Sequence, residues 1–457
     1  MPPPSELLPE WYDMQGLILS AYDRLPESAY LLFRIAPGRE TDAQHWMREN
    51  LLPHVTPVEK RARRAGDVTL NIAFTFTGLD KFAALSGQRP VGFSAAFSEG
   101  IDGNEHRCRI LGDVDGADST TWRWGGHPHP VDVLVMVFAP DAARLGQWIA
   151  AIDGSFGSIG VRRAIVGVNR RDMKLPGSPE GREHFGFVDG VSQPMLAGTD
   201  AAERFPESRH LTALGEFVLG YPNAADITPQ VPLLTRCASF GRNGSYLVLR
   251  QLEQDYAGFW KYFHQQAQGD ASLGEHLAEK VIGRRLDGKP LVPMTGPTDN
   301  EFGFAEDAHG YGCPMGSHIR RANPRDSFDD TNEPAKAAIS ANIHRLLRRG
   351  RPYGAPYWKD PTAAERGLVF VCLNASIEQQ FEFIQQNWVN SAEFLGVAGE
   401  CDPLIGTRGV TGGRRNCFTI PALPLPARID TLPSFVRVRG GEYFFLPGLA
   451  ALEELAG

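Results

Sequence analysis

The order of apolar segments along the 457-residue chain restricts its fold more than any other feature. A short run rich in leucine, valine and aromatic residues is followed by an amphipathic stretch, and this strand-then-helix unit occurs twice in each half. The four units are 30–35 with 42–52, 133–139 with 141–152, 245–250 with 252–263, and 368–373 with 376–388. In the second unit, apolar residues recur at the spacing that places them on one face of a helix. That stripe consists of Leu145, Trp148, Ile149 and Ile152.

Further strand-like runs lie between the units, for example at 69–76 and 159–168. Strand–helix units separated by extra strands match a split β-α-β arrangement, in which helices cover one face of an antiparallel sheet. We therefore expect an α+β fold of two ferredoxin-like halves, similar to a dimeric α+β barrel. The expected halves are 1–220 and 221–457, with the junction between about 210 and about 240.

The composition argues against a nucleic-acid or membrane partner. Hydrophobic residues make up 42% and charged residues 22%, and 46 basic against 54 acidic residues give a net charge of −8. The basic residues are scattered, whereas a nucleic-acid protein usually carries a basic face. The longest apolar run, 133–139, is far shorter than the roughly 18 residues of a membrane helix. With no recognisable signal pattern at the N-terminus and no C-x-x-C pair among the six cysteines, we expect a cytoplasmic protein with reduced thiols.

Two long segments, 169–209 and 270–340, lack clear periodicity. Irregular segments of that length in a compact domain are usually functional or disordered, and these carry too many aromatic residues to favour disorder. The first contains the pentapeptide GFVDG, with Asp189 beside a glycine. An Asp-Gly pair is also a common turn signal, so this stretch alone leaves a turn and a catalytic acid both open.

The second segment contains a histidine among arginines, in the stretch SHIRRANPRD. Neighbouring positive charge disfavours a protonated imidazole, and a neutral imidazole is a metal ligand. His318 is therefore a candidate ligand, although an isolated histidine more often has a structural role. Cys313, in a Cys-Pro pair, is a rival because a thiolate can also be an axial haem ligand.

A third stretch, LLRRGRPYG at 346–354, adds three arginines to the nearby Arg345. Guanidinium groups bind carboxylates, phosphates or peroxide oxygens, but a solvated basic segment would have the same sequence. The glycine- and arginine-rich stretch 412–415 is likewise either a haem propionate contact or a surface turn.

Seven sequence blocks together resemble the dye-decolorizing peroxidases, in the order in which that family carries them. The blocks cover about residues 180 to 450, while the earlier part resembles the family only in its strand–helix order. They are GFVDG with Ser192-Gln193-Pro194, GEFVLGYPN (215–223), NGSYLVLRQL (243–252), SHIRRANPRD (317–326), LLRRGRPYG (346–354), FEFIQQNW (381–388) and GGEYFFLPG (440–448).

The resemblance implies a haem peroxidase made of two ferredoxin-like halves, with haem b held mainly by the C-terminal half. Such an enzyme reduces hydrogen peroxide through an oxoferryl intermediate and oxidises dyes, phenols and similar aromatic donors. The chain length resembles the larger intracellular bacterial branch of the family, and either a monomer or a homodimer is compatible with it. Because a carboxylate stays ionised in mild acid, where an imidazole is protonated, we expect an acidic optimum for dye oxidation.

The resemblance also implies roles for individual residues. His318 corresponds to the proximal iron ligand, Asp189 to the distal acid-base residue and Arg348 to the distal arginine, with a shift to the adjacent Arg349 left open. Further residues are implied around the cofactor: Leu368 and Phe370 in the distal pocket, Arg320 as a cofactor contact, and Asp402 as the carboxylate that accepts the second ring proton of His318.

Three other functions compete with this interpretation. A haem-handling protein that releases iron would bind haem with little peroxide turnover. A non-haem hydrolase would use Asp189 in a carboxylate pair, as glycosidases do, and would show no Soret band. A binding module with a ferredoxin-like fold would leave the ordered motifs unexplained.

Overall fold

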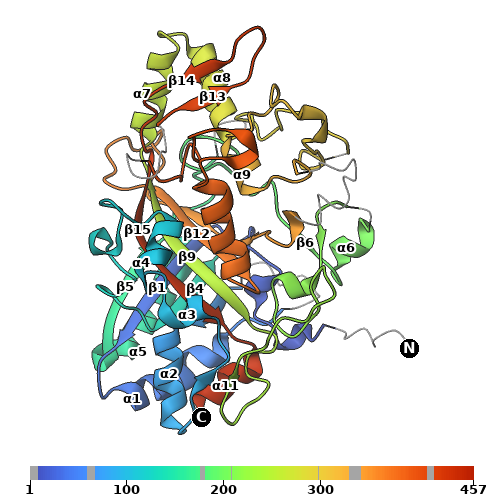
Figure 1. The fold of residues 1–457 in the computed structure, drawn as a ribbon. Coiled ribbons are helices and arrows are strands. Elements are labelled where there is room, and N and C mark those ends of the chain that lie inside the picture. Colours follow the sequence, from blue (N-terminus) through green and yellow to red (C-terminus); the bar gives the residue numbers. More distant parts are fainter. Residues whose placement is uncertain are drawn as a thin grey trace, which may run out of the picture.

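The computed structural model describes most of the chain (Figure 1). The described residues are 9–58, 67–174, 181–206, 208–296, 298–328, 341–408 and 416–457. None of the helices in these ranges is both long and apolar enough to cross a membrane.

A large antiparallel sheet forms the centre of the protein. Within the described ranges it has nine strands in the order β10-β12-β9-β15-β2-β4-β1-β5, with β11 also paired to β12. The strands are β1 (Glu27–Ile35), β2 (Thr69–Phe74), β4 (Val133–Ala139), β5 (Gly160–Val166), β9 (Ser245–Gln254), β10 (Leu347–Arg348), β11 (Arg351–Tyr353), β12 (Gly367–Asn374) and β15 (Val436–Leu446). The strands expected from the strand–helix units are all present, which confirms the α+β class.

The two halves of the chain contribute to this one sheet side by side. β2, β4, β1 and β5 come from the N-terminal half, and β10, β12, β9 and β15 come from the C-terminal half. The two sets meet where Phe445 of β15 pairs with Phe74 of β2. The exact domain boundary near residue 220 stays a prediction.

The sheet curves until its two ends meet. Gly167, just beyond β5, forms an antiparallel bridge with Tyr353 of β11, and the Val168 amide donates to the Pro352 carbonyl oxygen at 3.1 Å. β11 in turn pairs with β12 at the other end of the sheet. The strands therefore approach a closed barrel, which agrees with the expected barrel-like arrangement, although no sequence pattern indicated which residues close it.

Helices cover the outer face of the sheet. Successive strand residues point to opposite faces, so Leu31 and Phe33 of β1 pack against the helices while Tyr30 and Leu32 pack on the inner side. The covering helices are α1 (Glu40–Trp46), α2 (Phe76–Leu85), α5 (Ala142–Phe156) and α11 (Leu449–Ala456). α5 begins at an Asp141 cap that accepts the Arg144 amide at 2.8 Å and buries Leu145 and Ile152, as the predicted stripe requires.

The inner face is covered by loops and single-turn helices instead of α-helices. Trp11 and Met14 of the N-terminal segment pack there with Phe217. Arg349 donates to the carbonyl oxygens of Leu17 and Ile18 at 2.7 and 2.6 Å. These charged hydrogen bonds attach the N-terminal segment to the C-terminal half.

Two predicted helices differ from the structure, and one further helix lies where none was predicted. α7 (Tyr256–Gln266) begins after Leu252, which belongs to β9, because that strand pairs along its full length with β12 and β15. α8 (Ala271–Ile282) lies inside the segment 270–340 that we expected to be irregular, and it packs with α7. The predicted helix at 376–388 consists of two π-helical segments, η9 (Glu378–Glu382) and η10 (Ile384–Val389).

Short elements complete the described chain. The remaining strands and α-helices are β3 (Pro90–Val91), α3 (Ala95–Glu99), α4 (Glu105–Leu111), β6 (Met195–Leu196), α6 (Asp200–Arg204), β7 (Leu211–Thr212), β8 (Leu233–Leu234), α9 (His318–Ala322), β13 (Phe418–Ile420) and β14 (Ala427–Ile429). The other single-turn helices are η1 (Trp11–Asp13), η2 (Gly16–Ile18), η3 (Met47–Leu51), η4 (Leu52–His54), η5 (Ser119–Thr121), η6 (Gly157–Ile159), η7 (Leu214–Glu216), η8 (Ala305–Asp307) and η11 (Phe394–Gly396). Figure 1 shows α7, α8, β13 and β14 at one end of the molecule and α1, α2 and α11 at the other.

Candidate active site

His318 is the first residue of α9, and two buried arginines hold this short helix in place. Arg321 donates to the carbonyl oxygens of Trp388 and Glu400 at 2.6 and 2.7 Å. Arg320 donates to the Cys313 carbonyl oxygen at 2.7 Å and also bonds to Asp307. These bonds let Arg320 position the His318 loop, and its expected contact with a cofactor stays a prediction.

A fully buried carboxylate fixes the His318 ring. Nδ1 of His318 lies 2.9 Å from Oδ2 of Asp402, and the other carboxylate oxygen accepts the Leu404 and Ile405 amides at 2.8 and 3.0 Å. Burial alone would raise the pKa of Asp402, but the charge of His318 and these hydrogen bonds lower it. The carboxylate therefore stays ionised and accepts the Nδ1 proton, which leaves the Nε2 lone pair of a neutral ring available.

The environment of His318 suits a ligand that is partly accessible. Burial would lower its pKa, but the charge of Asp402 and the hydrogen bond to it raise the pKa above the ordinary value. About a quarter of the side chain, 26%, is exposed, and Nε2 has no hydrogen-bond partner in the described part of the chain. The charges of Arg348 and Asp189 also act on this pKa, so the three residues belong to one neighbourhood.

Cys313, the rival ligand from the sequence, does not have the character of a thiolate. It is completely buried, its Sγ lies 3.1 Å from the Ser317 hydroxyl, and burial raises its pKa to about 11. Because a ligand must be deprotonated, this thiol is a packing residue.

Asp189 lies in a turn that a neighbouring glutamate holds together. Glu183 accepts the backbone amides of Phe185 and Phe187 at 2.8 and 2.9 Å and the Gln254 side-chain amide at 2.7 Å. Burial raises the pKa of Glu183 to about 7. Gly186 and Gly190 have φ of 102° and 79°, in the left-handed region that favours glycine. The turn leaves the Asp189 side chain 40% exposed.

Arg348 lies beside Asp189, because Ser192 and Gln193, which follow GFVDG in the same loop, both contact Arg348. Nη1 of Arg348 is 3.9 Å from Oδ1 of Asp189. Its Nη2 donates to the Ser192 carbonyl oxygen at 2.9 Å, and its backbone amide donates to Oε1 of Gln193 at 3.1 Å. Both charged side chains remain more than a third exposed, where an ion pair contributes only about 0–1 kcal/mol to stability. The pairing therefore has little structural value of its own.

Strand geometry separates Arg348 from Arg349. Arg348 pairs with Cys372 of β12, whereas Arg349 points to the other side and donates to the N-terminal segment. Arg351 also donates to backbone carbonyl oxygens there, at Leu25, Ala21 and Tyr22. Only part of the predicted arginine cluster is thus free for an anion.

Leu368 and Phe370 share the sheet face of Arg348. Paired residues point to the same side, and alternate residues of a strand do too, so Phe370 and Leu368 follow Cys372 on that face. Both are only partly buried, in contrast to the fully buried Val369 and Val371 between them. The structure thus gathers the predicted distal residues on one side of the sheet.

The donor set fits an iron porphyrin better than a bare metal ion. Within the described ranges, no group of three or more His, Cys, Asp or Glu side chains could hold a metal ion alone. A single imidazole, fixed by a carboxylate, suits an iron whose other ligands come from a porphyrin.

Sequence reasoning missed Glu183 and Gln193 as parts of this site. Both stand within a few residues of Asp189, in the stretch EHFGFVDGVSQP, so their proximity was the available signal. The arginine-rich stretch 412–415 lies outside the described residues.

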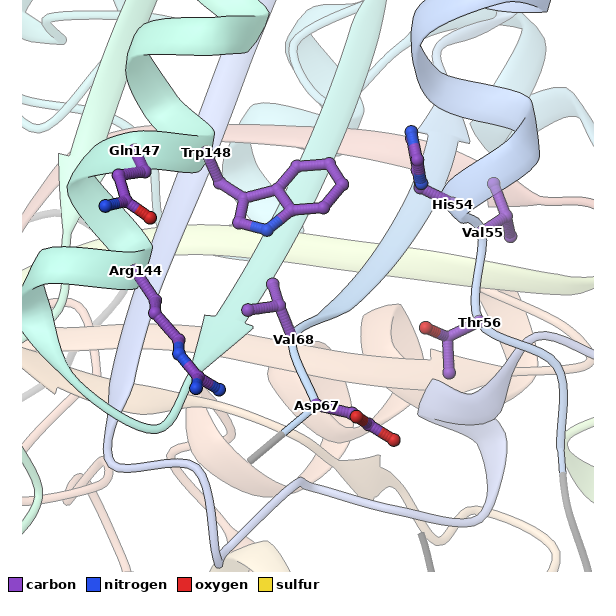
Figure 2. Close-up of a pocket in the computed structure, with 8 residues that line it drawn as sticks. All are labelled: His54, Val55, Thr56, Asp67, Val68, Arg144, Gln147 and Trp148. Carbon is purple, nitrogen blue, oxygen red and sulfur yellow. The ribbon is translucent and has the colours of Figure 1, made fainter. Parts of the chain in front are cut away.

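A surface hollow exists in another part of the molecule (Figure 2). None of the predicted site residues lines it, and its wall comes from the η4 region, the start of β2 and α5. In Figure 2 the Trp148 ring faces His54, and the two rings lie 4.8 Å apart, edge to face. The lining residues are His54, Val55, Thr56, Asp67, Val68, Arg144, Gln147 and Trp148.

Comparisons with known proteins agree with the geometry. A family model described as Dyp-type peroxidase, C-terminal, matches residues 233–396. Peroxidase 2 of Mycetinis scorodonius is 30% identical over an alignment of 493 residues, and the alignment covers 96% of this chain and 86% of that protein. Dye-decolorizing peroxidase msp1 of the same organism is 29% identical over 307 residues, 61% of this chain and 57% of that protein, so the match spans little more than half of msp1.

The fold has solved counterparts. The crystal structure of a DyP-type peroxidase from Anabaena sp. superposes with a TM-score of 0.77 at 25% identity, covering 97% of this chain and 94% of that one. Sequence motifs, site geometry, relatives and fold all point the same way, and the chain belongs to the Dyp-type peroxidase family.

Proposed function

We propose that this peroxidase binds haem b through His318, reduces hydrogen peroxide with Asp189 and Arg348, and oxidises dyes and similar aromatic donors. The observation that carries the proposal is the grouping of a carboxylate-fixed imidazole with an acid–arginine pair in one neighbourhood. The relatives named as dye-decolorizing peroxidases support the class of donor.

His318, Asp402 and the distal face would hold the cofactor. His318 would present Nε2 to the iron, Asp402 would keep the Nδ1 proton, and Leu368 and Phe370 would provide apolar contacts. When bound, haem supplies an iron centre at which the O–O bond of hydrogen peroxide is cleaved and which then withdraws electrons from a donor.

Asp189 would move the proton that this cleavage requires. A carboxylate within hydrogen-bond reach of both peroxide oxygens can accept a proton from one and return it to the other. The Asp189 side chain is 40% exposed; its Oδ1 accepts the Gly190 amide at 2.7 Å, and the carboxylate would be accessible to a small substrate.

Arg348 would stabilise the negative charge that grows on the departing oxygen. Its guanidinium is held by the Ser192 carbonyl oxygen, so it needs little reorganisation. It lies 3.9 Å from the Asp189 carboxylate, so the proton-transfer group and the charge stabiliser would act on the same substrate.

The competing hydrolase has less support. It requires a second carboxylate that acts with Asp189, and the neighbouring Glu183 uses its oxygens to accept backbone amides. The cytoplasmic location, the branch of the family and the state of assembly stay predictions.

The proposal is tested by mixing the haem-loaded protein rapidly with hydrogen peroxide. Asp189→Asn should lower the second-order rate constant by about 100-fold or more, because general acid–base catalysis contributes at least that much. Asp172→Asn is the matched control, since Asp172 is an exposed aspartate that pairs with Lys359. An unchanged rate constant in Asp189→Asn would assign the proton transfer to another group.

A further inference from the structure

Arg345 is a buried cation that forms no ion pair with a carboxylate of the described residues, although the Glu301 carboxylate lies 3.7 Å from Nε2 of its neighbour His210. Only 7% of the residue is exposed, and its guanidinium makes a single hydrogen bond within the described part of the chain, to Nδ1 of His210 at 3.3 Å. No ion pair involves it there. Burying a guanidinium without a counter-charge costs several kcal/mol, so such a residue usually has an anionic partner.

His210 is a neutral partner that orients this guanidinium. Its Nε2 lies 2.9 Å from the Asn300 carbonyl oxygen, so this nitrogen carries the proton and Nδ1 accepts from Arg345. Burial and the charge of Arg345 lower the pKa of His210 to about 3, which keeps the ring neutral. The imidazole therefore fixes the direction of Arg345 without offsetting its charge.

The neighbouring arginines differ from Arg345 in their partners. Arg325 donates to Asn300 and to the Phe302 carbonyl oxygen, and Arg284 donates to the carbonyl oxygens of Gly288 and Asp299. Their guanidinium groups donate to polar oxygens, whereas among the described residues the guanidinium of Arg345 has only the His210 nitrogen as an acceptor. Burial is the main cause that lowers the pKa of Arg345, and the charge of Arg348 lowers it further. Arg345 therefore lies close to the candidate site.

We propose that Arg345, oriented by His210, binds a carboxylate ligand at the edge of the site formed by His318, Asp189 and Arg348. A planar guanidinium can bind a carboxylate with two parallel hydrogen bonds, which would supply the missing negative charge. The carboxylate has two possible sources, a propionate of the cofactor or a small carboxylic acid. The first source rests on the proposed function. The arginine-rich stretch 412–415, also considered for a propionate, lies outside the described residues.

The first arm of the test compares ferric protoporphyrin IX with its dimethyl ester. Binding to the full-length apoprotein is followed by fluorescence quenching, and ligation by the Soret band. Wild type should bind the free acid about tenfold or more tightly than the diester, because a charge-assisted pair contributes at least that factor. Arg345→Gln should lose most of this preference and Arg345→Lys should retain part of it.

A matched control removes a charge that already has a partner. Arg209 pairs with Asp326 at 3.7 Å and its side chain is 40% exposed, so Arg209→Gln should keep the preference for the free acid. Thermal unfolding shows whether each variant is folded. If Arg209→Gln also lost the preference for the free acid, the preference would report the overall positive charge of the protein, and a specific carboxylate site at Arg345 would be overturned.

The second arm titrates the haem-loaded protein with benzoate. If wild type shows no preference for the free acid but benzoate shifts its Soret band, and Arg345→Gln abolishes the shift, the ligand is a small carboxylic acid. If Arg345→Gln changes neither the porphyrin preference nor the benzoate response, the inference is wrong while the peroxidase proposal stands. If no porphyrin gives a Soret band, the proposed function fails, and a rise in the melting temperature with benzoate in wild type but not in Arg345→Gln would still support the carboxylate site.

Discussion

The guanidinium of Arg348 lies 3.9 Å from the Asp189 carboxylate and donates to the carbonyl oxygen of Ser192, three positions further along the same loop. The loop that carries the proposed acid thus also holds the proposed charge stabiliser. Displacement of the loop would disturb both groups at once, so proton transfer and charge stabilisation should be lost together.

Adjacent arginines should respond in opposite ways to the same substitution. Arg348→Gln should slow the reaction with hydrogen peroxide by about 100-fold with little change in stability, because it removes a donor aimed at developing charge. Arg349→Gln should lower the free energy of unfolding by about 1–3 kcal/mol, since the Leu17 and Ile18 carbonyl oxygens lose their donor. Stopped-flow mixing and urea unfolding measure the two effects. The reverse pattern would make Arg349 the functional residue.

Asp402→Asn should weaken haem binding by about 10- to 100-fold, as loss of a carboxylate partner of a metal-binding histidine usually does. The matched control is Asp326→Asn, which removes another buried carboxylate, one that pairs with Arg209. Affinity is measured by transfer of haem to apomyoglobin. Equal haem loss in both variants would show that Asp402 acts only on general stability.

The same variant should change the titration of His318 in the apoprotein. Burial lowers the pKa of His318, but the Asp402 carboxylate raises it above the ordinary value. The pairing of His318 with Asp402 therefore stabilises the folded protein fully below the ordinary pKa of the ring, about 6.5. This stabilisation is lost as the pH rises through the raised pKa. Without Asp402, burial and Arg348 remain, and the pKa should fall below the ordinary value. NMR titration of the ring protons gives both values, and an unchanged pKa would contradict the pairing.

Glu183→Gln should slow peroxide reduction by about tenfold without weakening haem binding. The amide cannot accept both the Phe185 and Phe187 amides, so the turn that places Asp189 should loosen. A fall in haem affinity of the same size would instead indicate a general structural role. Stopped-flow kinetics and haem transfer distinguish the two results.

Glu183 should also leave a signature in the dependence of stability on pH. Burial raises its pKa from 4.5 to about 7, so the folded state retains this proton where the unfolded state has lost it. The stability of wild type relative to Glu183→Gln should therefore fall as the pH rises from 4.5 to 7, by up to about 3 kcal/mol. Urea unfolding at several pH values measures the difference, and a difference that does not vary with pH would contradict a buried, protonated Glu183.

The periodic parts of the fold were predictable because they depend on local pattern. The α5 stripe and the strands around Tyr30 and Val248 follow from the alternation and spacing of apolar residues. The start of α7 could not be predicted in this way, because β9 continues through Leu252 to pair with β12 and β15. Closure of the sheet at Gly167 and Tyr353 is likewise a long-range contact without a local signal.

The site residues were found by motif rather than by periodicity. His318, Asp189 and Arg348 are far apart in the sequence, and no spacing rule brings them together. The contact between His318 and Asp402 was expected from the family resemblance, and the structure shows it at 2.9 Å. Arg345 and His210 could not be linked beforehand, since only the folded chain shows that the guanidinium is buried against His210 and forms no ion pair with the described residues.

The most direct test of the account is the absorption spectrum of the full-length protein with added haem, in wild type and in His318→Ala. Wild type should show a Soret band typical of a histidine-ligated haem, and His318→Ala should lose this band or show the band of free haem. Addition of imidazole should restore ligation in the variant. A wild-type protein that fails to bind haem, or a variant with an unchanged spectrum, would contradict His318 as the ligand on which the account depends.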